Sequence, residues 1–116
     1  PDGARDRAAV QELGSGLSRA RFMAVAMRSP VEVLFDLKER TWRSSPAGPK
    51  GRLPDVGISV LGIDGVTARD SATSAIQFYP DGGSSGGTIL IDMPGNQGKP
   101  TRIAADWLSG RIEVRD

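Results

Sequence analysis

One long helix at the start of the chain, followed only by segments that read as strands, is the pattern that most constrains this fold. Apolar residues recur at spacings of three and four over residues 4–28, which places them on one side of a helix. Asp2 or Gly3 can cap this helix, and Ser29-Pro30 ends it, because a residue before proline avoids helical backbone angles. The apolar stripe consists of Val10, Leu13, Leu17, Ala20, Ala24 and Met27.

The two halves of this helix differ in composition. Residues 5–12 are mostly charged beside a thin apolar line, whereas residues 22–27 are all apolar. A helix of about 25 residues measures ~37 Å and a strand of four to six residues only ~20 Å, so the helix must extend beyond its sheet. We therefore predict that the second half is buried and that the first half stands partly clear. An assembly interface at Val10, Leu13 and Leu17 is expected there, with plain exposure to solvent as the alternative.

The rest of the chain alternates between strand-like and turn-like segments. The expected strands cover residues 31–37, 41–43, 56–63, 75–79, 87–93, 101–105 and 111–115, and a single bent strand is the alternative to the first two. Irregular loops are expected at 44–54, 66–73 and 94–100. In the last strand, Ile112 and Val114 should face inward. A helix segregated from its strands predicts an α+β fold with antiparallel sheets packed on the helix.

A glycine-rich segment at residues 78–91 reads as strand, tight loop and strand. Asp81-Gly82-Gly83 is a strong turn signal, and residues 88–91 resume as a β-branched run. A phosphate-binding loop does not fit, because no lysine follows the glycines and no helix opens after them. We therefore interpret this segment as a hairpin connection.

Composition excludes several classes of function. The chain has 116 residues and a net charge of +1, which suits one domain without strong attraction to nucleic acid or anionic lipid. It contains no cysteine and no histidine, which excludes thiol chemistry and Ser-His-Asp catalysis. Ser84 and Ser85 therefore have no histidine to activate them as nucleophiles. No apolar run is long enough to span a bilayer. We expect no enzyme activity, no cofactor and no metal site.

Three further groups of residues have a simpler interpretation than a binding site. A calcium site would need the oxygen ligands of Asp64, Asp70, Asp81 and Asp92, but their spacing matches no such loop. Trp42 and Trp107 could stack on a base or sugar, although packing in the core or on a sheet is favoured. Three arginines read as a solvated helix face: Arg19, Arg21 and Arg28.

Four segments carry a family likeness when taken together in order. They are the helix end with Ala20-Arg21 and Ala24, the strand at residues 30–36, the block Phe78-Tyr79-Pro80-Asp81-Gly82 followed by Ser84-Ser85-Gly86-Gly87, and the distal Leu108-Ser109-Gly110-Arg111-Ile112. This combination resembles the H-type minor pseudopilins of type II secretion, the GspH family, and the related FimT-like minor pilins. The likeness spans nearly the whole chain.

The resemblance implies a pilin-like fold and a role without catalysis. It implies one domain over residues 1–116, with 1–29 as the last part of a helical spine and 30–116 as its β-sheet part. A transmembrane half of the helix and a basic leader cut by a prepilin peptidase are then expected upstream of Pro1. Members of the family stack in a periplasmic pseudopilus anchored in the bacterial inner membrane, which helps push folded proteins through an outer-membrane channel. The implied partners are the major pseudopilin and the minor pseudopilins of the tip.

DNA binding is the alternative that the resemblance raises. The FimT branch binds DNA through a C-terminal Gly-Arg-x-Arg pattern, which would here involve Arg111 and Arg115. This chain has Glu113 at the second arginine position, and a carboxylate beside phosphates would repel them. We therefore expect a structural secretion subunit first and a DNA-binding minor pilin second, with no nucleic-acid partner for the first.

Overall fold

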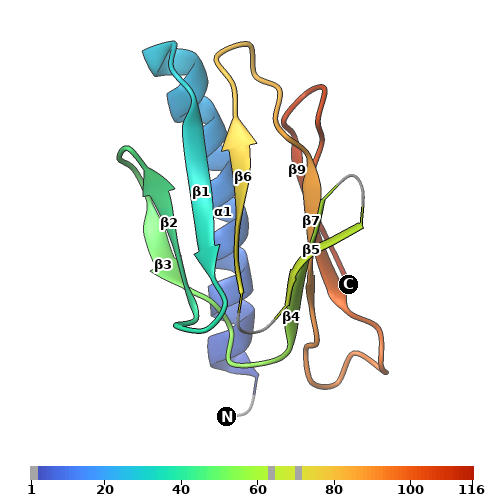
Figure 1. The fold of residues 1–116 in the computed structure, drawn as a ribbon. Helices are drawn as coiled ribbons and strands as arrows, with labels where there is room; N and C mark the ends of the chain where they lie inside the picture. The colour runs from blue at the N-terminus through green and yellow to red at the C-terminus, as the bar shows by residue number, and fades with distance from the viewer. Residues whose placement is uncertain (1–2, 63–64, 70–71) are drawn as a thin grey trace.

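The computed structural model describes residues 3–62, 65–69 and 72–116 of the chain. In the described part, one helix runs the length of the molecule, and in the view of Figure 1 it lies behind strands β1 and β6. The elements are α1 (Ala4–Met27), β1 (Val31–Asp36), β2 (Thr41–Ser45), β3 (Lys50–Arg52), β4 (Ile58–Gly62), β5 (Gly65–Arg69), β6 (Thr73–Phe78), β7 (Gly87–Ile91), β8 (Thr101–Ala105) and β9 (Ile112–Arg115).

The helix ends one residue before its predicted end at 28. Arg28 adopts a left-handed conformation with φ 54°, and the backbone N–H groups of Arg28 and Ser29 donate to the carbonyls of Val25 and Ala24. These bonds satisfy carbonyls that a helix end would otherwise leave without partners. At the start, Gly3 precedes the helix without a side-chain cap, while Asp2 lies outside the described residues.

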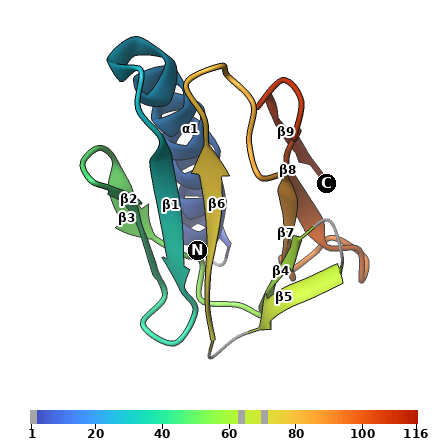
Figure 2. The ribbon, with the colours of Figure 1, turned by 45° about the horizontal axis from the view of Figure 1, so that its top comes forward.

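Two antiparallel sheets account for the strands. The first has the order β3-β2-β1-β6 and the second the order β5-β4-β7-β8-β9. Figure 2 shows the two sheets splayed apart, with α1 behind the first and β9 returning toward the helix. The predicted α+β class, with a long helix packed on antiparallel sheets, is confirmed.

Three local predictions are wrong. The loop at 44–54 contains β3, which pairs with β2, and the segment at 66–73 contains β5, which pairs with β4. Backbone pairing at a sheet edge overrides the weak strand propensity of Lys50-Gly51-Arg52 in particular. The glycine-rich segment is not a hairpin, because β6 belongs to the first sheet and β7 to the second. The turn expected at Asp64-Gly65 includes a residue outside the described ranges.

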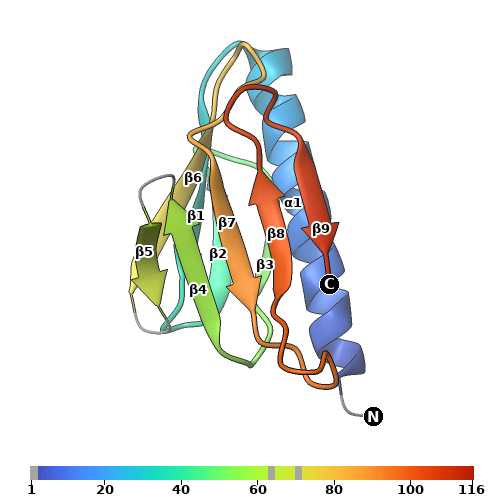
Figure 3. The ribbon, with the colours of Figure 1, turned by 90° about the vertical axis from the view of Figure 1, so that its right-hand side faces the viewer.

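The core lies between the helix and the inner faces of both sheets. Strand β1 alternates as predicted, with Val31, Val33 and Phe35 buried and the residues between them half-buried. Trp42 on β2 is 3% exposed and confirms the packing interpretation for that residue. Its ring lies against Gly16 of α1 and Gly51 of β3, which leave room for it because they carry no side chain. Figure 3 shows the second sheet from its outer side, with α1 beside β9.

Candidate assembly surface

The first half of α1 is part of the core, which corrects the prediction that it stands clear of the sheet. Leu13 and Leu17 are 0% exposed and Val10 is 6% exposed. The reason is that β3 and β9 both reach the helix, so the sheets cover more of its length than one short strand would. The exposure on which an assembly interface at these three residues was predicted is therefore absent, although an indirect role for them in assembly stays a prediction.

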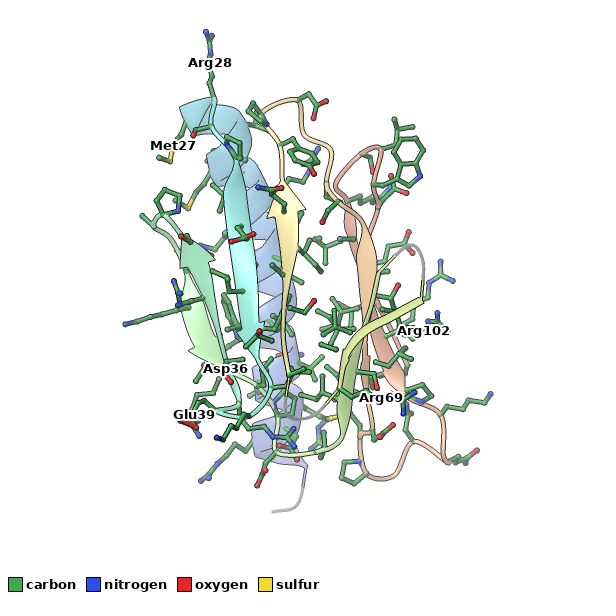
Figure 4. All side chains as sticks on the ribbon, in the orientation of Figure 1. Met27, Arg28, Asp36, Glu39, Arg69 and Arg102 are labelled. Atoms are coloured by element: carbon green, nitrogen blue, oxygen red, sulfur yellow. The ribbon has the colours of Figure 1, made fainter. Side chains whose placement is uncertain are left out.

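The C-terminal end of the helix instead presents apolar side chains to solvent. Phe22 is 71% exposed and Met27 53% exposed, with Val25 also exposed. The prediction that this half is broadly buried is wrong, because six consecutive apolar residues cover every side of a helix and only one side can face a sheet. Ala20 and Ala24 occupy the buried side. Figure 4 shows Met27 and Arg28 projecting from this end of α1.

The turn between β8 and β9 exposes two more large apolar residues at the same end of the molecule (Figure 1). Trp107 is 61% exposed and Leu108 70% exposed, so the packing interpretation is wrong for Trp107. Asp106 fixes the turn, since one of its carboxylate oxygens accepts bonds from the Leu108 N–H at 3.1 Å and from the N–H and hydroxyl of Ser109 at 2.7 and 2.9 Å. The pKa of Asp106 is lowered, chiefly by the two bonds from Ser109; desolvation opposes this shift, and the bond from Leu108 adds a smaller lowering effect.

Arg21 ties this turn to the helix and to the glycine-rich loop. Its guanidinium Nε donates to the carbonyl of Gly82 at 3.1 Å and to that of Ser109 at 2.8 Å. The prediction that Arg21 belongs to a solvated face is therefore wrong. Gly110 has φ 70° and lies so close to the carbonyl of Gly82 that a Cβ there would collide with it, so glycine is required at this crossing.

The glycine-rich loop serves as the support beneath the exposed turn. Asp81 accepts a bond from the Gly83 N–H at 2.9 Å, which confirms the turn role predicted for it. The Ser84 hydroxyl donates to the carbonyl of Asp106 at 2.8 Å, and the Ser84 N–H donates to that of Trp107 at 2.9 Å. The Asp81 carboxylate, considered above as a calcium ligand, therefore stabilises the glycine-rich loop itself, and the Ser84 hydroxyl, considered above as a nucleophile, connects this loop to the turn between β8 and β9.

The two arginines of the DNA-binding alternative are both exposed near the C-terminus. Arg115 donates to Glu113 at 2.9 Å, an ion pair between exposed side chains on β9. Arg111 lines a surface hollow with Trp107 and Glu113. The expectation that Glu113 would repel phosphate stays a prediction, and the structure adds that its carboxylate pairs with Arg115.

For the calcium set, Asp64 and Asp70 lie outside the described ranges. Within the described residues, no three acidic side chains gather as a metal site would require. No helix among those residues is both long and apolar enough to cross a membrane.

A long helix packed against two antiparallel sheets, with loops gathered at the C-terminal end of that helix, defines a pilin-like protein. The structure is similar to that of the minor pseudopilin EpsH of the type 2 secretion system of Vibrio cholerae, with a TM-score of 0.69 and 13% identity over 95% of this chain and 94% of that one. It is also similar to the type IV minor pilin FimU of Pseudomonas aeruginosa, with a TM-score of 0.67 and 16% identity over 97% and 89% of the two chains. At these identities the likeness concerns the fold.

The sequence comparisons identify the family within this class. Residues 9–109 match the family described as type II transport protein GspH. The chain is 31% identical over 112 residues to the type II secretion system protein H of Xanthomonas campestris pv. campestris, which covers 96% of this chain and 63% of that protein. The chain belongs to the GspH family, a family of structural pseudopilins rather than of enzymes. It spans under two thirds of the length of this relative.

Proposed function

We propose that this chain is the globular part of a minor pseudopilin, a structural subunit of the pseudopilus that helps export folded proteins by type II secretion. The observation that carries the proposal is the match to the GspH family over residues 9–109, which includes most of the helix, strands β1 to β8 and the first residues of the turn that follows β8. The composition agrees with it, since a chain without histidine or cysteine is poorly equipped for catalysis.

The finer parts of this proposal follow from the family. Residues 1–29 are the last part of a longer helical spine, whose upstream half crosses the bacterial inner membrane after cleavage of a basic leader. The β-sheet part, residues 30–116, lies in the periplasm. The partners are the major pseudopilin and the minor pseudopilins of the tip. The match covers 63% of the Xanthomonas relative, so that protein is longer than the matched region.

We assign the contacts with neighbouring subunits to the exposed apolar residues at this end of the molecule, which are Phe22, Val25 and Met27 of the helix end and Trp107 and Leu108 of the turn. We call these residues together the apolar end surface, although they lie on more than one side of the helix. Exposed patches of large apolar side chains mark sites of protein association, and tryptophan is enriched among the residues that dominate such interfaces. The turn is fixed by Asp106 and Arg21, so little conformational freedom is lost when it binds.

The test is complementation in the source organism. Deletion of the gene should leave a folded type II substrate in the periplasm, and the natural full-length gene on a plasmid should restore its export. A deletion strain that secretes this substrate at the normal level would refute the proposed function.

A further inference from the structure

The strand β9 leaves one of its two edges without a partner strand. It is the last strand of its sheet and pairs only with β8. The Asp106 N–H donates to the Arg111 carbonyl at 3.0 Å, and hydrogen-bonded pairs alternate along an antiparallel ladder. The backbone groups of Glu113 and Arg115 therefore face β8, whereas those of Ile112, Val114 and Asp116 face outward. Among the described residues, no strand pairs with this outward edge.

A groove runs along this free edge, with α1 as its other wall. Its upper part has a volume of about 850 Å³ and lies between Ile112 and Val114 of the strand and Gly14, Ser15 and Ser18 of the helix. A smaller hollow continues it toward Arg7 and Asp116, with Val114 and Gln11 common to both. The small helix residues leave room beside the strand, and the Val114 side chain is 49% exposed although it faces the helix.

The groove has about the length of one short strand. Its helix wall extends from Arg7 to Arg19, which corresponds to ~18 Å at the rise of an α-helix. An extended chain of five to six residues covers about this length. We propose that the groove binds an extended segment of a neighbouring subunit, which adds to β9 as a further strand of the second sheet. The identity of the partner as a pseudopilus subunit rests on the proposed function.

The charges on the groove specify the chemistry of this segment. Arg7 and Arg19 are exposed at its two ends, and within the described residues the one ion pair is that of Arg115 with Glu113. At the lower end Asp116 lies in the same hollow as Arg7, but the upper part of the groove has no acidic residue in its lining. The bound segment should therefore carry apolar residues at alternate positions, facing Val114 and the helix, and a carboxylate at the end beside Arg19.

A second copy of this chain fits the groove less well. Helix α1 lies beside β9, so two copies joined edge to edge through β9 would bring both helices to the same side of the seam (Figure 3). The occupant should thus be a strand without a helix behind it, such as a terminal tail or an exposed hairpin.

The experiment is amide hydrogen exchange by NMR on this chain, with an acetylated hexapeptide of alternating valine and threonine that ends in aspartate as the probe. At about nine-tenths saturation, exchange at Ile112, Val114 and Asp116 should slow by roughly tenfold, with little change at Glu113 and Arg115. Val114→Pro removes one outward donor without breaking the ladder to β8 and should abolish this protection. Ser15→Tyr fills the groove from the helix and should do the same.

Charge reversal provides the matched control. Arg19→Glu should weaken binding of the aspartate peptide by about tenfold and strengthen binding of the same peptide ending in lysine.

Equal protection at the opposite free edge, β5, or no protection at saturating peptide would overturn the proposal. Slow exchange at β9 without peptide, together with a dimer in sedimentation, would overturn it in favour of a second copy. If Val114→Pro abolishes peptide binding but export stays normal, the groove is not used in secretion, while the proposed function stands.

Discussion

Gly16 of α1 lies directly over the indole ring of Trp42, and a Cβ at this position would fall well inside the van der Waals distance of three ring carbons. The helix and the first sheet can approach each other closely at this point because Gly16 has no side chain and the indole ring of Trp42 is flat. The contact lies in the middle of α1.

Gly16→Ala is expected to destabilise the protein although alanine favours helix. The gain in helix propensity is about 1 kcal/mol, and the displacement of a buried indole costs about 1–3 kcal/mol. Gly14→Ala is the matched control, because its Cβ meets a single methyl of half-exposed Val114 at 3.2 Å. Urea unfolding should show Gly16→Ala less stable than the wild type and Gly14→Ala equal or more stable. The reverse order would contradict the packing described.

Arg21→Ala should loosen the turn between β8 and β9 and cost about 1–2 kcal/mol of stability, since a half-exposed charged donor to two carbonyls is lost. The change should also increase the mobility of Trp107, which fluorescence anisotropy can follow when Trp42 is replaced by phenylalanine. Arg19→Ala, an exposed change nearby, should alter the unfolding free energy by less than about 0.5 kcal/mol. Similar effects of the two substitutions would show that the hydrogen bonds of Arg21 do not stabilise the turn.

Asp106 should make the turn sensitive to acid. Its pKa is lowered in the folded state, so the stabilisation that it provides is fully present above the ordinary aspartate pKa of about 4 and is lost as pH falls through the lowered value. Asp106→Asn should remove this part of the acid dependence. NMR titration of the carboxyl group should give a pKa below that of a model aspartate, and Ser109→Ala should raise it. An ordinary pKa in the wild type would contradict the hydrogen bonding described.

Leu13→Asp or Leu17→Asp should unfold the isolated domain, because a carboxylate would replace a fully buried side chain at a cost of about 3–5 kcal/mol. Phe22→Glu should leave the unfolding free energy nearly unchanged and reduce export in the complementation assay. Circular dichroism and urea unfolding measure whether the Leu13, Leu17 and Phe22 variants are folded and how stable they are. A folded Leu17→Asp variant would mean that this half of the helix is not part of the core.

DNA binding should be weak. Because Glu113 pairs with Arg115, a gel-shift assay with double-stranded DNA at moderate salt should show no tight complex. Glu113→Ala should increase any residual binding by freeing Arg115. Tight, salt-sensitive binding by the wild type would favour the DNA-uptake alternative.

The class of fold could be predicted from the sequence because helix periodicity and strand alternation are local patterns. The alternation of Val31, Val33 and Phe35 and the extent of α1 are both confirmed. The partition of strands between two sheets could not be predicted. The strands on either side of the loop between Phe78 and Gly87 join different sheets, and the local sequence does not indicate which strand each of them pairs with. Edge strands such as β3 were missed because their residues have little strand propensity.

The burial of the helix was predicted in the wrong half for a related reason. A count of apolar residues along α1 indicates how much of the helix could be buried, but not how far the sheets extend beneath it. Leu13 is covered because strands of both sheets contact α1, whereas Phe22 lies on a side of the helix that does not face them, although Ala20 and Ala24 next to it are buried. Arg21 was missed as a structural residue because its partners, the carbonyls of Gly82 and Ser109, lie far from it in the sequence.

Site-specific crosslinking in cells tests most directly whether the apolar end surface holds this subunit in a pseudopilus. The natural full-length protein would carry a photoreactive amino acid in place of Phe22 or Trp107, or in place of Glu39, which lies at the opposite end of the molecule (Figure 4). The account predicts crosslinks to another pseudopilin from Phe22 and Trp107 and none from Glu39. Crosslinks from Glu39 alone, or none from any position in a secreting strain, would contradict it.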